Sequence, residues 1–119
     1  MKISEAISII QRKDISNNHN PEAEVKGGCG ADLMSDVLAS TQPESILLTG
    51  LCNPQVIRTA QVADIKAVIF VRGKIPPKET IDLALKENIP LFTTPLGMFE
   101  ACGRLYEAGL PSYEGLFEI

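Results

Sequence analysis

The sequence predicts an α/β domain, a three-layer α/β/α sandwich around a mostly parallel sheet of four or five strands. Three short apolar runs, each ending in a small or polar turn, are separated by helix-length segments; the runs are 46–50, 67–73 and 89–95. They lack period-two alternation, which is typical of strands covered on both faces, and the segments between them are long enough for parallel crossovers. The stretch 46–95 therefore predicts a βαβαβ core.

The composition favours a single cytoplasmic domain that binds small molecules or proteins. The chain has 119 residues, of which 45% are hydrophobic, and a formal net charge of −4 without a block of lysine and arginine. This balance argues against a nucleic-acid partner and against an anionic membrane surface. The N-terminal ten residues are too polar for a signal sequence, and no window approaches a membrane span.

The domain divides into an N-terminal helix and loop (1–21), an α/β core (22–109) and an apolar tail (110–119). Isoleucines recur at helical spacing in the first ten residues, and turn-forming residues follow in 16–21. His19 is the single histidine and should be exposed in this loop. The tail carries Leu110, Tyr113, Leu116, Phe117 and Ile119, which must fold back or meet a partner.

The start of the core predicts a strand over 22–26 that enters a glycine-rich turn over 27–30. This turn is either a plain tight turn or a loop that holds an anion with its N–H groups; it matches neither nucleotide-binding fingerprint. Asp32 should cap a helix that ends near Ser40. Its buried stripe should comprise Leu33, Met34, Val37 and Leu38.

Three further helices follow the apolar runs. Asn53 and a proline predict a helix over 54–63, and a proline pair predicts another that ends at Asn88 in left-handed conformation. The last helix should cover 96–108 and end at Gly109. One side of it should carry Phe99, Cys102, Leu105 and Tyr106, with Cys102 in the core.

The carboxyl ends of parallel strands share one edge of the sheet, where ligands of such folds bind. Arg72 follows a buried strand directly, so its guanidinium can contact a carboxylate or phosphate there, or form a structural salt bridge. We expect a small anionic ligand, a nucleotide among the candidates, in a polar pocket at this edge. Its residues should be Gly28, Asp32, Thr49, Gly50, Asn53, Arg72, Gly73 and Thr93.

Catalytic and metal chemistry find little support in the residues. Asp32 and Asp36 share a helix face, where they can hold a metal or act as acid and base, or can simply cap the helix and face solvent. Cys29 and Cys52 lie in two of the turns expected at this edge. Their thiols could bind a metal together or form a redox couple. We expect no cofactor, no metal site and no enzymatic activity.

Several segments together resemble a DRTGG domain. The resemblance covers roughly 22–109 and is specific as an ensemble; it is carried by Gly27–Gly28, 32–39, 68–77, 88–94 and 99–106. The chain departs from the pattern that names the family. It has Leu51-Cys52-Asn53 where Asp-Arg would stand and Val71-Arg72-Gly73 in place of Thr-Gly-Gly, which retains only the last glycine.

The resemblance implies an α/β sandwich similar to the N-terminal domain of HPr kinase/phosphorylase, without its kinase activity. It also implies a non-catalytic regulatory or ligand-sensing module that self-associates as a homodimer. The alternative is an interaction adaptor for a redox enzyme or a kinase that binds no small molecule. This alternative would use the tail and the surface of Met98, Phe99 and Tyr106.

Overall fold

The computed structural model describes residues 1–16, 20 and 22–119, so His19 and part of the predicted loop 16–21 lie outside the described residues. Within them, five strands form one sheet in the order β1-β5-β4-β3-β2. Only β1 is antiparallel to its neighbour, which confirms the mostly parallel sheet. The strands are β1 (Lys13–Asp14), β2 (Gly27–Gly30), β3 (Ser45–Thr49), β4 (Ile65–Phe70) and β5 (Leu91–Thr93).

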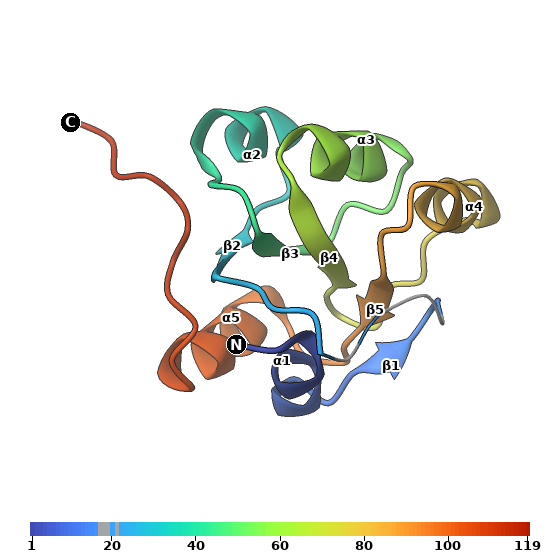
Figure 1. Cartoon of the computed structure of the whole chain (residues 1–119), viewed down its shortest axis with the longest axis horizontal. Coiled ribbons are helices and arrows are strands. Elements are labelled where there is room, and N and C mark those ends of the chain that lie inside the picture. The colour runs from blue at the N-terminus through green and yellow to red at the C-terminus, as the bar shows by residue number, and fades with distance from the viewer. Residues whose placement is uncertain (17–19, 21) are drawn as a thin grey trace.

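Helices lie on both faces of this sheet, an arrangement compatible with the predicted sandwich (Figure 1). Three of them connect consecutive parallel strands and pack on one face, as right-handed crossovers require. They are α2 (Met34–Ser40), α3 (Gln55–Val62) and α4 (Lys78–Lys86). The other face carries α1 (Ile3–Ile9) and α5 (Met98–Glu107). In the described part of the chain, no helix combines the length and the apolar character that crossing a membrane requires.

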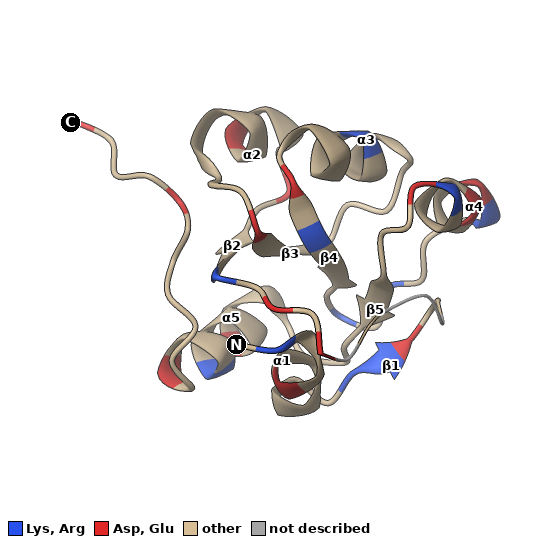
Figure 2. Cartoon of the chain, viewed as in Figure 1, with Lys and Arg blue, Asp and Glu red and all other residues tan. Residues whose placement is uncertain are grey.

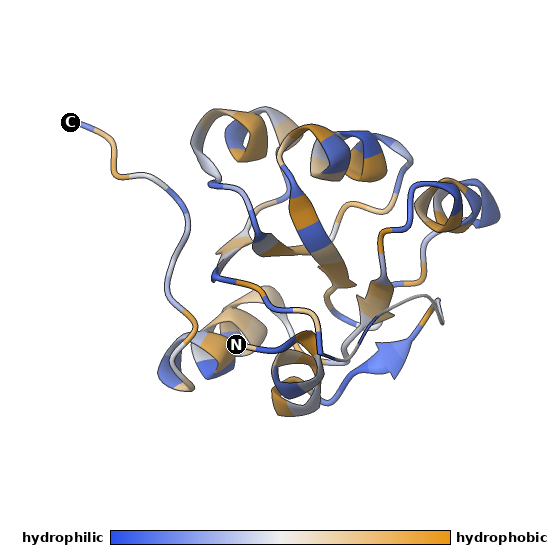
Figure 3. Cartoon of the chain, in the orientation of Figure 1, coloured by the Kyte–Doolittle hydropathy of each residue, from blue (hydrophilic) through white to orange (hydrophobic). Residues whose placement is uncertain are grey.

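Each face of the sheet has its own apolar core. Leu48 and Ile69 belong to the core under α1 and α5, whereas Leu47 and Phe70 belong to the core under the other three helices. Successive residues of one strand therefore serve opposite cores, which explains why the strands are apolar throughout. Figure 3 shows this concentration of apolar residues on the central strands.

The glycine-rich segment is a strand and not a turn, so the predicted strand over 22–26 is wrong. Glu24 forms only an isolated bridge to Lys2, whereas 27–30 pairs in parallel with β3. A methyl group on Gly30 would lie 2.7 Å from Cys102 Sγ of α5. Because this strand lacks side chains toward α5, the helix can pack close to it.

The helix after β2 starts later than predicted, and Asp32 is not its cap. The N-cap residue of α2 is Leu33, while Asp32 hydrogen-bonds elsewhere, to the end of β3. The buried stripe is also narrower than predicted. Met34 and Val37 are buried, but Leu33 and Leu38 are exposed.

The other helix boundaries lie within two residues of the predicted ones. Asn88 and Gly109 have φ values of 58° and 106°, as predicted for left-handed residues that end helices. The predicted face of α5 is wrong in part, since Phe99 is 93% exposed. Cys102 is half-buried rather than part of the core, because the glycines of β2 leave space beside it.

The tail folds back along the outer edge of β2 before it leaves the domain. Leu110 is buried, and a methyl group on Gly27 would lie 2.3 Å from the ring of Tyr113. The Gly28 N–H donates to the Pro111 carbonyl at 2.9 Å, so the tail shields an otherwise open sheet edge. The remaining apolar residues extend away from the globule (Figure 1); they are Leu116, Phe117 and Ile119.

Candidate functional site

The carboxyl ends of β3, β4 and β5 meet at one edge of the sheet, as the sequence predicts. Thr49 is paired with Phe70, and Phe70 is paired in turn with Thr93. The two threonines are buried with their strand ends. The loops that follow these three strands therefore lie at the same edge of the sheet.

The segment after β4 is a tight turn that presents two cations. The Lys74 N–H donates to the Val71 carbonyl at 3.3 Å, and both central residues have positive φ, 58° at Arg72 and 66° at Gly73. Positive φ at both central positions is the mark of a type I′ turn. Only Gly73 adopts this conformation without cost, so the turn holds Arg72 in an unfavourable conformation of the kind that often marks functional sites.

Neighbouring segments hold this turn in place. The Arg72 N–H donates to the Leu96 carbonyl at 2.8 Å, and the Gly73 N–H donates to the Thr94 carbonyl at 2.7 Å. The Thr93 hydroxyl lies 2.8 Å from the Lys74 carbonyl. These contacts fix the backbone that carries both cations.

The side chains from three loops converge beside Gly50, which ends β3. A methyl group on Gly50 would lie 2.9 Å from Arg72 Nη2 and 3.4 Å from each of Asp32 Oδ1 and Lys74 Nζ. The space that a side chain would fill at Gly50 is therefore bordered by two cations and one carboxylate. We call Asp32, Thr49, Gly50, Arg72 and Lys74 the rim cluster.

Within the rim cluster, the carboxylate is engaged with the backbone. Asp32 Oδ1 accepts hydrogen bonds from the Gly50 N–H at 2.7 Å and from the Thr49 hydroxyl at 3.2 Å. The Thr49 hydroxyl in turn accepts the Leu51 N–H at 3.1 Å. Asp32 thus stabilises the loop after β3 and lies beside the two cations without forming an ion pair with either of them.

The two cations of the rim cluster form no ion pair with any residue that the structure describes. Lys74 Nζ donates to the Gly50 carbonyl at 3.1 Å, and the side chains of Arg72 and Lys74 are both exposed. Figure 2 shows that basic and acidic residues are otherwise interspersed along the elements. The rim cluster is therefore a local positive site on an acidic protein.

The structure brings four of the predicted site residues together, and it places the others in separate roles. Asp32, Thr49, Gly50 and Arg72 belong to the rim cluster. Asn53 Oδ1 accepts the Gln55 N–H at 3.0 Å at the start of α3.

Gly73 and Thr93 support the turn, whereas Gly28 lies apart from it under the tail. Lys74 was missed, although a lysine directly after a strand-ending Arg-Gly pair is a signal that sequence inspection can detect.

The three cysteines are free, and no group of three or more metal-ligating side chains occurs in the described part of the chain. Cys29 lies within β2 and not in a turn, and burial raises the pKa of its thiol to about 11. Burial also raises the pKa of Cys52 and of Cys102. All three thiols therefore favour the protonated form at neutral pH.

No protein-family model and no curated protein matches this chain. Among solved structures, it is similar to the CBS and DRTGG domains of the regulatory region of Clostridium perfringens pyrophosphatase, complexed with the activator diadenosine tetraphosphate. The TM-score is 0.69 at 21% sequence identity, and the match covers 96% of this chain and 50% of that one. The likeness supports the DRTGG-like domain predicted from the sequence; at this identity it shows the fold alone.

Proposed function

We propose that this protein is a non-catalytic regulatory module that senses a small anionic ligand, a nucleotide, at the rim cluster. The observation that carries the proposal is the meeting of Arg72 and Lys74 beside Gly50, where no carboxylate pairs with either cation among the described residues. A guanidinium and an ammonium in this arrangement suit phosphate oxygens. The absent side chain of Gly50 lets both cations approach the end of β3 closely.

The similar solved structure supports the nucleotide class and the regulatory role. That structure is a regulatory region, and the activator bound to it is a dinucleoside polyphosphate. The chain spans half the length of that structure, so the ligand site of the pyrophosphatase is not transferred to this chain residue by residue. The proposal of a nucleotide ligand rests on the two cations of the rim cluster and on the nucleotide bound in a solved structure of similar fold.

Thermal-shift measurements with adenine and guanine nucleotides test the proposal. At about 100 times its Kd a ligand adds about 2.7 kcal/mol to stability, which raises Tm by several degrees in a domain of this size. Arg72→Asn should abolish the shift, since it removes the guanidinium and asparagine tolerates positive φ. Arg58→Gln is the matched control, because Arg58 is exposed on α3 and forms no ion pair with the described residues.

We also propose that the protein forms a homodimer, and the exposed apolar side chains of α5 favour this. Phe99 and Tyr106 of α5 are 93% and 66% exposed, and Gly103 between them leaves a shallow apolar hollow. Exposed apolar side chains that gather on one helix face often mark protein contacts. Sedimentation equilibrium should give a dimer that Phe99→Ser weakens and that Val62→Ser, an exposed apolar residue of α3, leaves unchanged.

A monomer at all concentrations would contradict the homodimer. The same surface of α5 would then favour the adaptor role, in which a redox enzyme or a kinase is the partner.

A further inference from the structure

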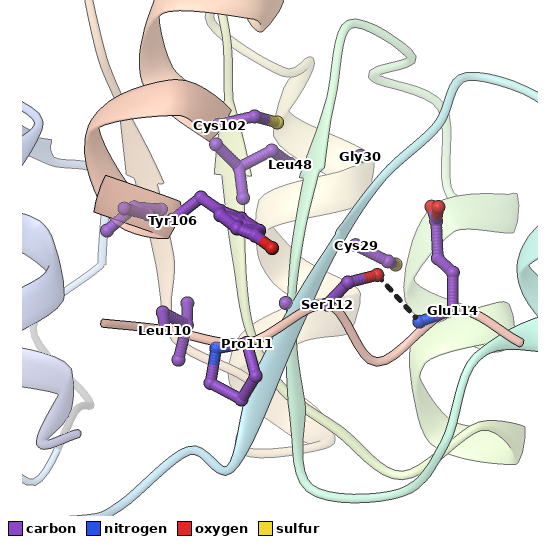
Figure 4. Close-up of a pocket in the computed structure, with 11 residues that line it drawn as sticks. Cys29, Gly30, Leu48, Cys102, Tyr106, Leu110, Pro111, Ser112 and Glu114 are labelled. Carbon is purple, nitrogen blue, oxygen red and sulfur yellow. Dashed lines mark hydrogen bonds between the residues drawn. The ribbon is translucent and has the colours of Figure 1, made fainter. Parts of the chain in front are cut away.

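A cavity that is separate from the rim cluster lies between α5, β2 and the tail (Figure 4). Its volume is about 270 Å³. Its apolar lining includes the buried residues Leu48, Leu105 and Leu110. Tyr106, Ser112 and Glu114 stand at its margin (Figure 4). A volume of this size is near the lower end of small-molecule sites.

The cavity exists because β2 has no side chains on this side. Gly28 and Gly30 lie on the face toward α5, and a methyl group on Gly28 would lie 3.1 Å from the Leu110 side chain. Leu110 and Cys102 approach the strand without filling the space between them. The tail then closes the side of the cavity, since the Tyr113 N–H donates to the Gly28 carbonyl at 2.9 Å.

The backbone of β2 offers the cavity a donor and an acceptor. The backbone N–H and C=O of Gly28 point away from β3 and hydrogen-bond to the tail. The Ala31 N–H points toward β3 and donates to the Leu48 carbonyl at 3.1 Å. Because the bonding direction alternates along a strand, Gly30 points its N–H and C=O outward as Gly28 does. No hydrogen bond from a described residue outside the sheet reaches Gly30.

Three side chains add polar groups to the margin. Figure 4 shows the Tyr106 hydroxyl, the Ser112 hydroxyl and the Glu114 carboxylate around the opening. The Ser112 hydroxyl accepts the Glu114 N–H at 3.3 Å. No described residue hydrogen-bonds to the Tyr106 hydroxyl or to the Glu114 carboxylate, so both remain available to a ligand.

The chemistry of these groups selects a ligand with N–H donors and no negative charge. Glu114 is a charged acceptor and the Gly30 carbonyl is a neutral one, and no lysine or arginine lines the cavity. A phosphate or carboxylate would be repelled here. An apolar floor beside an aromatic ring suits a flat body.

We propose that this cavity binds an uncharged planar nitrogen heterocycle of nucleobase size. Its ring lies on Leu48 and Leu110, its N–H groups donate to Glu114 and to the Gly30 carbonyl, and a ring acceptor receives the Gly30 N–H. The ring can come from a free base, from a nucleoside, or from a nucleotide whose phosphates lie outside the cavity. The proposal does not require the rim cluster to bind anything.

Titrations followed by ¹H–¹⁵N NMR test it, with adenine, guanine, adenosine, guanosine and the matching monophosphates as probes. At least one free base or nucleoside should shift the amide signals of Gly28, Gly30, Ser112 and Glu114 saturably. Glu114→Gln should weaken this binding about tenfold, since the N–H donor of the ligand loses a charged acceptor. Tyr106→Phe is a second variant, which removes the hydroxyl at the margin of the cavity and keeps the aromatic ring.

Glu107→Gln, which removes an exposed carboxylate of α5, should leave the affinity unchanged. Equal affinity in wild type and Glu114→Gln would overturn the proposal, as would no shift with any base or nucleoside at millimolar concentration. Shifts that centre on Gly50 and vanish in Arg72→Asn would also overturn it, while supporting the rim cluster. Nucleoside binding that persists in Arg72→Asn would establish the cavity as an independent site.

Discussion

Asp32 holds the loop that carries part of the proposed binding surface. Its carboxylate lies at the carboxyl edge of the sheet, where Arg72 and Lys74 also end, but it accepts the Gly50 N–H at 2.7 Å. The loop after β3 is therefore held by a charged acceptor. This hydrogen bond keeps Gly50, which is buried, next to the two cations.

Two replacements of Asp32 should separate the effect of its hydrogen bond to Gly50 from the effect of its negative charge. We expect Asp32→Ala to lower the free energy of unfolding by about 1–2 kcal/mol, because the buried Gly50 N–H loses its acceptor. Asp32→Asn should cost less, since its amide oxygen can still accept. Urea unfolding of the two variants checks this, and equal stability of wild type and Asp32→Ala would contradict it.

The thiol of Cys29 should be unreactive at neutral pH. Burial raises its pKa to about 11 from an ordinary value of 9.0, and the hydrogen bond from the Thr41 hydroxyl opposes the shift only in part. The rate of alkylation by iodoacetamide should therefore keep rising up to about pH 11, since the thiolate is the nucleophile. Mass spectrometry of the Cys29 peptide, with the urea-unfolded chain as reference, measures the profile.

The same shift has a consequence for stability. Since the folded thiol holds its proton more tightly than the unfolded one, its contribution is complete below about pH 9 and is lost as pH rises to about 11. A labelling profile that levels off near pH 9 would show that Cys29 is not buried as described.

At the scale of elements, β2 and the tail depend on each other. The strand is built of glycine except at Cys29, so it has little to bury by itself. It is held between β3 on one side and the tail on the other, and Tyr113 lies over Gly27. An exposed edge of this kind would otherwise invite pairing with another chain.

Gly27→Ala should release the tail. The new methyl group would lie 2.3 Å from two ring carbons of Tyr113 and 2.8 Å from its Cβ, so the whole side chain must move. We expect faster amide hydrogen exchange over 112–115. Gly103→Ala is the matched control, because no atom lies within 4 Å of its new methyl group and alanine should stabilise α5 by about 0.5–1 kcal/mol. Unchanged exchange in Gly27→Ala would contradict the packing of Tyr113 on β2.

The central strands and their helices were predictable because each leaves a local pattern in the sequence. Apolar runs mark β3, β4 and β5, and prolines, asparagines and a glycine mark the helix ends. The strand β2 was not predictable this way, because glycines carry no hydrophobic pattern and the strand is held by β3, the tail and α5, which are distant in sequence. The two-residue strand β1 is too short to leave a pattern.

At the scale of the whole molecule, the topology explains why part of the site could be predicted. Parallel strands in the order β5-β4-β3-β2 bring Thr49, Gly50 and Arg72 to one edge, although 22 residues separate the last two in sequence. Proximity along that edge follows from topology. The direction of each side chain does not, which is why Lys74 was missed and why Thr93 turned out to support the turn.

Binding of phosphate groups at the rim cluster can be measured by an NMR titration with inorganic tripolyphosphate. This probe carries no base, so the cavity between α5, β2 and the tail does not contribute. We expect saturable shifts of the Gly50, Arg72 and Lys74 amides in wild type and in Arg58→Gln, and loss of those shifts in Arg72→Asn. Shifts that are absent at millimolar tripolyphosphate, or equal in wild type and Arg72→Asn, would contradict the account.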